Sequence, residues 1–122
     1  MESEKSVYHD KEIDSTNIDE FGQFTVDMWF SAPEDDIKSL AIMTLGLAGE
    51  TGEVVEPIKK FIRDGTVPDN EMLKKELGDC FYYLCRICKY FGYYPSEVLK
   101  ANIEKLKSRN ERGVLRGSGN DR

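Results

Sequence analysis

Four segments of the chain carry apolar residues at the three- and four-residue spacing of amphipathic helices. The predicted helices span about residues 17–30, 34–63, 69–91 and 95–110. Pro33, the turn at Asp64–Asn70 and Gly92 separate them, because proline and glycine end helices. Pro57 lies inside the second segment, where it removes a backbone donor, so we expect a kink near residues 53–57 or two stacked helices. The pattern predicts an all-α bundle of four to five helices.

Two pairs of acidic residues border the apolar stripes of the second and third predicted helices. Glu50 and Glu53 form the first pair, and Glu76 and Asp79 form the second. At 3.6 residues per turn, a spacing of three places both members of a pair on one face, about 60° apart. Carboxylate pairs on a solvated surface are common in a chain with 23 acidic residues. The position beside the apolar stripes distinguishes these two pairs from ordinary surface charge.

Glycines also lie within these helical segments, at Gly46, Gly49, Gly52 and Gly78. Each glycine costs a helix about 1 kcal/mol relative to alanine. We therefore expect the backbone to approach another helix or a ligand closely there.

The two acidic pairs are expected to face each other and to hold a divalent cation. Carboxylates brought together repel one another, and their pKa values rise unless a cation joins them. Oxygen ligands without matching histidine or cysteine select Mg²⁺ or Mn²⁺ over zinc. Such an ion bridges phosphate oxygens and lowers the pKa of a bound water, and one carboxylate can be spared as general base.

The pattern ExxE, 22 residues and then ExxD resembles the MazG-like all-α NTP pyrophosphohydrolases. The segments GLAGETGEVVEPIKK and KKELGDCFYYL are similar to small, single-domain members from bacteria and phages, and the resemblance covers about residues 20–110. It implies a bundle of the all-α NTP pyrophosphatase type, completed as a homodimer or homotetramer. The implied reaction converts a nucleoside triphosphate to monophosphate and pyrophosphate. Mg²⁺, with Mn²⁺ as a substitute, would be held by the catalytic residues Glu50, Glu53, Glu76 and Asp79.

Six further residues are candidates for substrate binding. Lys60 lies near Glu53 on its helix and could meet phosphate, and Tyr83 could donate a hydrogen bond to sugar or phosphate. Trp29 could stack on a base, although the aromatic residues of its helix are most simply core. The resemblance assigns nucleotide contacts to Asn102 and Lys105. Arg109 shares their face, and solvated surface is the alternative for all three.

Length, charge and composition bear on the domain organisation, the partners and the location of the protein. The 122 residues form one predicted domain at 17–110, with an N-terminal arm at 1–16 and a Gly/Arg-rich tail at 111–122 that is either flexible or folds over bound phosphates. A net charge of −6 argues against nucleic acid as the main partner. No apolar run is long enough to span a membrane, and the acidic N-terminus has no signal-peptide pattern, which predicts a cytoplasmic protein. The three cysteines are expected to be buried thiols, because the only histidine, His9, lies far from them in the sequence.

Two alternatives share these features. The related all-α dUTPases and phosphoribosyl-ATP pyrophosphohydrolases also have acidic helical metal sites. A non-catalytic helical binding module would instead use the glycines for tight helix packing and leave the acidic pairs on the surface. Metal dependence separates the module from the enzymes, because a metal site is stabilised by its ligand.

Overall fold

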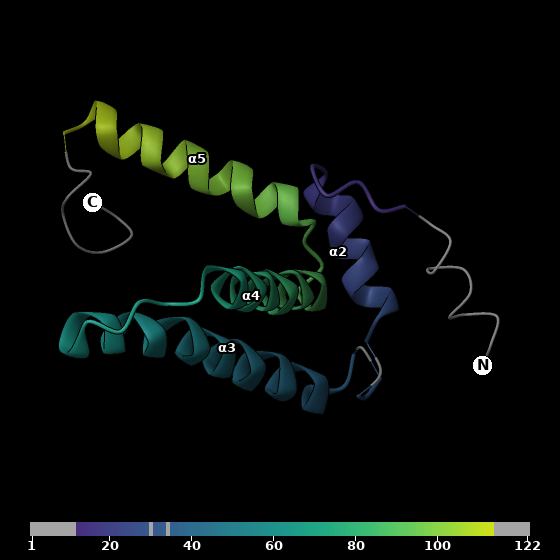
Figure 1. Ribbon diagram of the computed structural model, residues 1–122. Coiled ribbons are helices and arrows are strands. Elements are labelled where there is room, and N and C mark those ends of the chain that lie inside the picture. The colour runs from purple at the N-terminus through teal and green to yellow at the C-terminus, as the bar shows by residue number, and fades with distance from the viewer. Residues whose placement is uncertain (1–11, 30, 34, 114–122) are drawn as a thin grey trace.

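The computed structural model describes residues 12–29, 31–33 and 35–113. Within these ranges it contains four helices and no strand (Figure 1). The helices are α2 (Ile18–Asp27), α3 (Ile37–Asp64), α4 (Asn70–Tyr90) and α5 (Pro95–Glu111). The predicted all-α class is therefore confirmed. Most of the predicted arm and tail, residues 1–11 and 114–122, lies outside the described residues.

Local sequence signals explain where the helices begin and end. The side chains of Asn17, Asp36 and Asp69 accept hydrogen bonds from backbone N–H groups in the first turns of α2, α3 and α4. Gly65 ends α3 with a φ of 74°, a left-handed conformation that glycine adopts without steric cost. The chain turns again at Gly92, with a φ of 79°, before Pro95 starts α5.

Of the two arrangements expected around Pro57, a kink or two stacked helices, the second does not occur, because α3 is a single helix of 28 residues that contains this proline (Figure 1). Pro57 has no N–H, so the carbonyl of Glu53 lacks its usual donor one turn later. The missing N–H removes one donor from the ladder. Glu56, Lys59 and Lys60 on either side favour helix, which explains why α3 continues.

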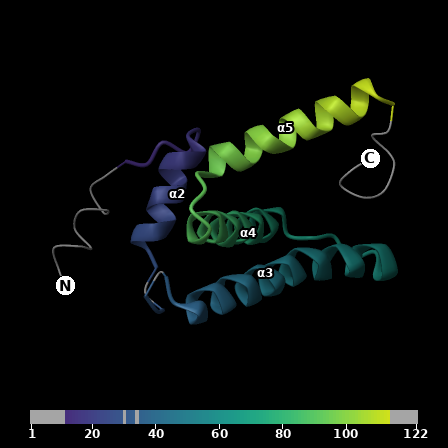
Figure 2. The ribbon, with the colours of Figure 1, turned by 180° about the vertical axis from the view of Figure 1, so that it is seen from behind.

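In both ribbon views α4 lies between α3 and α5 (Figure 1 and Figure 2). The most extensive packing joins α3 to α4, and α4 also contacts α2 and α5. The helices α3 and α5 make no contact with each other. None of the described helices is long and apolar enough to cross a membrane.

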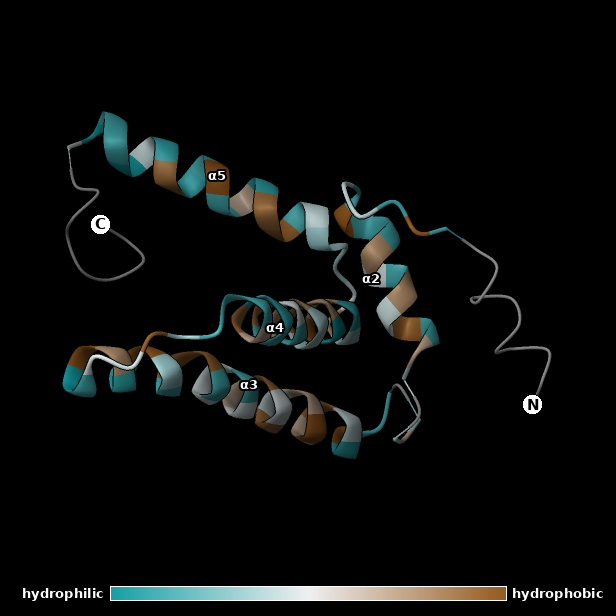
Figure 3. Cartoon of the chain, viewed as in Figure 1, coloured by the Kyte–Doolittle hydropathy of each residue, from teal (hydrophilic) through white to brown (hydrophobic). Residues whose placement is uncertain are grey.

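Few hydrophobic side chains are buried in the single chain. Met43 of α3 and Cys85 of α4 are the only buried hydrophobic residues within the described ranges. Twenty large hydrophobic residues of the described part of the chain are exposed, and hydrophobic positions occur along the length of α3 and α5 (Figure 3). The predicted apolar stripes of the second and third segments are therefore only partly covered. Leu47, Val54, Leu73, Cys80 and Ile87 are partly buried, whereas Val55, Ile58, Phe61, Ile62, Leu77, Leu84 and Phe91 are exposed. The region where α3 meets α4 includes carboxylates of both helices.

The first turn of α5 is attached to α2. The carboxylate of Asp19 accepts hydrogen bonds from the backbone N–H of Ser96, at 2.8 Å, and from its hydroxyl. Gly22 lies against Pro95, since a Cβ at Gly22 would come within 2.9 Å of the proline ring. The direction of α5 is thus set by a joint with α2.

A second joint connects the α2–α3 linker to α4. The indole Nε1 of Trp29 donates to the carbonyl of Ala32 at 3.0 Å and to the hydroxyl of Ser39 at 3.1 Å. The guanidinium carbon of Arg86 lies 5.2 Å from the centre of the indole ring, and the Arg86 side chain is fully buried. Trp29 therefore joins the linker to α3 through Ser39 and to α4 through Arg86.

Candidate active site

Three of the four predicted acidic residues meet between α3 and α4. Glu50 of α3 and Glu76 and Asp79 of α4 each offer a carboxylate oxygen, and these oxygens all lie within 4.8 Å of one another. Glu50 and Glu76 are partly buried, whereas Asp79 is exposed. We call these three residues the acidic cluster. One side of the cluster is closed by the helix pair, and the other is open to solvent.

Glu53 lies outside the acidic cluster. Its side chain is exposed, but its negative charge is near enough to raise the pKa of Glu50. The fourth acidic residue therefore acts on the cluster electrostatically without joining its oxygens.

The pKa of Glu50 is raised from 4.5 to about 7. The largest cause is a hydrogen bond with the carboxyl of Glu76, followed by burial and by the charges of Asp79, Glu76 and Glu53. That hydrogen bond requires a proton on one of the two carboxyls. The buried Oε2 of Glu50 has no hydrogen-bond partner among the described residues.

A divalent cation fits this arrangement. The donors are all carboxylate oxygens, which are the ligands that Mg²⁺ and Mn²⁺ prefer. A cation would take the place of the shared proton and satisfy the buried oxygen of Glu50. Asp79 lies on the side of the acidic cluster that solvent reaches.

The glycines of the motif segments differ in what surrounds them. A Cβ at Gly46 would collide with the ring of Tyr83, so this glycine permits the close approach expected from the sequence. At Gly49, Gly52 and Gly78 the space that a Cβ would fill is open. The ring of Tyr83 also meets Tyr82 edge-on, with ring centres 5.2 Å apart.

Lys60, the predicted phosphate contact on α3, is exposed and forms no ion pair within the part of the chain that the structure describes. Its neighbour Lys59 pairs with Glu56 at 3.0 Å. Lys60 is thus the more available of these two ammonium groups.

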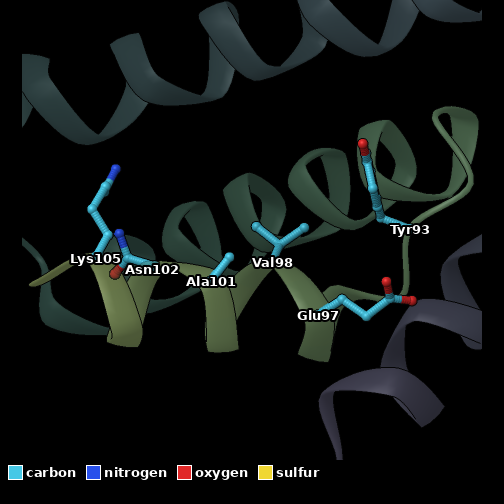
Figure 4. Close-up of a pocket in the computed structure, with 6 residues that line it drawn as sticks. All are labelled: Tyr93, Glu97, Val98, Ala101, Asn102 and Lys105. Carbon is cyan, nitrogen blue, oxygen red and sulfur yellow. The ribbon is translucent and has the colours of Figure 1, made fainter. Parts of the chain in front are cut away.

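A pocket of about 550 Å³ lies along α5. Its lining residues are Tyr93, Glu97, Val98, Ala101, Asn102 and Lys105. Tyr93, Val98, Asn102 and Lys105 project to the same side of α5 (Figure 4). The structure therefore brings together the two nucleotide contacts that the resemblance implied, on a helix that does not contact α3.

Arg109, the third residue predicted on that face, is buried, with 4% of its surface exposed, so it is not part of a solvated surface. The sequence interpretation also missed Arg86, which is fully buried under Trp29. The available signal was a charged residue inside the run Phe81–Cys88, which holds no other charge. Cys85 is the most buried of the three thiols, and all three are free.

A model of the MazG nucleotide pyrophosphohydrolase domain matches residues 38–114. The chain belongs to this family. The match includes both acidic motifs and all of α4 and α5, so the MazG domain provides the acidic cluster and the α5 pocket. The "Gene 37 protein" of Mycobacterium phage L5 is 38% identical over 92 residues, which cover 72% of this chain and 81% of that relative. No solved structure shows a significant match.

Membership of the MazG family supports nucleotide pyrophosphohydrolase activity and nucleotide binding. The family is typically metal-dependent, in agreement with the acidic cluster between α3 and α4.

Proposed function

We propose that this MazG domain hydrolyses nucleoside triphosphates to monophosphate and pyrophosphate with Mg²⁺, or Mn²⁺, held by Glu50, Glu76 and Asp79. The observation that carries the proposal is the convergence of these carboxylates from two separate motifs to within 4.8 Å. The buried Glu50 oxygen without a donor supports it, because such an atom calls for a cation or a proton. A surface pair without a ligand would not need that compensation.

The bound cation would supply charge neutralisation on the phosphates and a water of lowered pKa. In the hydrolysis, a water oxygen bonds to one phosphorus of the α–β anhydride and the bridging oxygen leaves with the other phosphate. We assign the proton of that water to Glu53, because its exposed carboxylate lies outside the acidic cluster but near it. Glu50 and Glu76 have the complementary role of fixing the site from its buried side.

Contacts to the nucleotide are proposed on α3 and α5. Lys60 extends from α3 without an ion partner among the described residues, which suits a phosphate contact. Asn102 and Lys105 line the α5 pocket and supply one neutral and one cationic donor for the nucleotide.

A second copy of the chain is proposed to cover the exposed apolar faces. A chain of 122 residues ordinarily buries a substantial core, yet this one buries only Met43 and Cys85 among its described hydrophobic residues. Exposed hydrophobic patches of this extent are typical of interfaces. Pairing through a two-fold axis brings the same faces of two copies together, which gives a homodimer or a dimer of dimers.

The test is turnover of a panel of ribo- and deoxyribonucleoside triphosphates, including dUTP, with Mg²⁺ and then with excess chelator. The expected result is chelator-sensitive release of monophosphate and pyrophosphate. Asp79→Asn should abolish it, whereas Glu71→Gln, an exposed carboxylate on the same helix that pairs with Lys74, should not. Absence of turnover of every triphosphate by folded protein would favour the helical binding module, and turnover of dUTP alone would favour the dUTPase alternative.

A further inference from the structure

The contact between Gly46 and Tyr83 lies beside the acidic cluster in both helices. Gly46 precedes Glu50 by four residues on α3, and Tyr83 follows Asp79 by four residues on α4. Four residues correspond to about one helical turn. The place where a tyrosine ring meets a glycine is therefore next to the place where the carboxylates of the two helices meet.

The ring of Tyr83 occupies space that any other residue at position 46 would need. A Cβ at Gly46 would lie closer than 3.0 Å to three ring atoms, Cδ1, Cε1 and Cζ. These atoms belong to a rigid ring and not to the end of a flexible side chain. Tyr82 packs edge-on against the same ring at an interplanar angle of 81°, so the ring is in contact with a second aromatic side chain.

We propose that Gly46 and Tyr83 are positioning residues, whose contact holds α3 and α4 at the separation that lets Glu50 share a cation with Glu76 and Asp79. The ring of Tyr83 acts as the spacer, and the missing side chain of Gly46 receives it. The hydroxyl of Tyr83 has no part in this role, which differs from the substrate hydrogen bond expected from the sequence. The positioning role rests on the proposed metal site, whereas the steric contact does not.

The positioning role requires that the binding of a shared cation depends on the distance between α3 and α4. Mg²⁺ requires oxygens at about 2.1 Å in near-ideal geometry. A methyl group inserted between two packed helices is not absorbed locally, because protein interiors are close-packed. An alanine at position 46 is therefore expected to move Glu50 away from the two ligands on α4.

Gly46→Ala is compared with Gly52→Ala, which adds the same methyl to the same helix where nothing lies within 4 Å. Unfolding is first measured without metal. Alanine favours helix over glycine at both positions, so Gly52→Ala should raise the melting temperature and Gly46→Ala should lower it. In a Tyr83→Ala background the penalty of Gly46→Ala should disappear, as a double-mutant cycle would report.

The second readout is the Mn²⁺ concentration that gives half of the maximal thermal stabilisation. Gly46→Ala should raise it about tenfold or more, Gly52→Ala should leave it unchanged, and Tyr83→Phe, which keeps the ring, should match the wild type. Destabilisation by Gly46→Ala without a change in this Mn²⁺ concentration would show a purely structural contact and overturn the positioning role. A wild type that Mn²⁺ does not stabilise would refute the proposed metal site and the positioning role with it. The metal-free comparison of the two alanine variants would still test the steric contact.

Discussion

At the scale of single residues, the titration of Glu50 should make the stability of the metal-free protein depend on pH. Its pKa in the folded chain is about 7, against 4.5 for the free side chain, so the native state keeps a proton that the unfolded state has already lost. In the metal-free protein, the contribution of Glu50 to the free energy of unfolding should therefore be fully present below about pH 4.5. It should be lost as the pH rises through about 7.

Urea unfolding across this pH range tests the prediction. Glu50→Gln should remove the loss of stability in metal-free protein, because its amide does not titrate. Saturating Mg²⁺ should remove it in the wild type, because a bound cation favours the charged carboxylate. An equal slope in Glu50→Gln and in wild type without metal would contradict the assignment, and Glu56→Gln, an exposed carboxylate on the same helix, provides the control.

Substitution of Glu53 should distinguish the loss of the chemical step from the loss of metal binding. As a proton acceptor outside the acidic cluster, it is expected to affect kcat and not the cation, so Glu53→Gln should lose about a hundredfold or more in kcat. Its thermal stabilisation by Mn²⁺ should persist, whereas Asp79→Asn should lose both properties. If Glu53→Gln lost the Mn²⁺ response as completely as Asp79→Asn, Glu53 would be a ligand and another group would have to accept the proton.

At the scale of helices, α5 depends on α2 for its first turn. Tyr94 occupies the N-cap position of α5, and the Asp19 carboxylate accepts the Ser96 N–H from another helix. Asp19→Ala should cost about 1 kcal/mol of stability, as the loss of a helix cap does. Because Asn102 and Lys105 lie on α5, it should also raise KM more than it changes kcat. Thermal unfolding and steady-state kinetics check both effects, and identical behaviour of Glu20→Ala, the neighbouring acid on α2, would contradict the role of Asp19.

The local features of these helices could be predicted from the sequence. The cap at Asp69 and the turns at Gly65 and Gly92 act within a few residues, so the ends of α3, α4 and α5 lie close to their predicted positions. The meeting of Glu50 with Glu76 and Asp79 was expected from their spacing and from the family pattern.

Features that join distant residues were not predictable in the same way. Asp19 and Ser96 are 77 residues apart, and neither carries a local signal for the other. Gly46 of α3 lies against the ring of Tyr83 on α4, whereas the apolar residues Val55 and Ile58 of the same helix are exposed. Periodicity identifies an apolar face but not the partner that covers it.

At the scale of the whole molecule, the small core suggests that association with a second copy stabilises the folded chain. If a second copy covers the exposed faces, the melting temperature should rise with protein concentration, because association stabilises the folded state by mass action. Sedimentation equilibrium should give an even multiple of the 14.0 kDa chain mass.

A charge on an exposed apolar face should shift this equilibrium. Phe81, with 52% of its surface exposed on α4, is a suitable position, and Phe81→Asp should favour smaller species or unfolded protein. Glu71→Gln on the same helix should leave the mass unchanged. A wild-type chain that sediments at 14.0 kDa and melts independently of concentration would contradict the proposed assembly.

The most direct measurement is the binding of Mn²⁺ to the metal-free protein, followed by the loss of the free-ion signal in electron paramagnetic resonance. Wild type and Glu71→Gln should bind the ion with the same stoichiometry and affinity, whereas Asp79→Asn should lose this binding because one of three converging carboxylates is gone. Undiminished binding by Asp79→Asn would show that the acidic cluster between α3 and α4 is not the metal site.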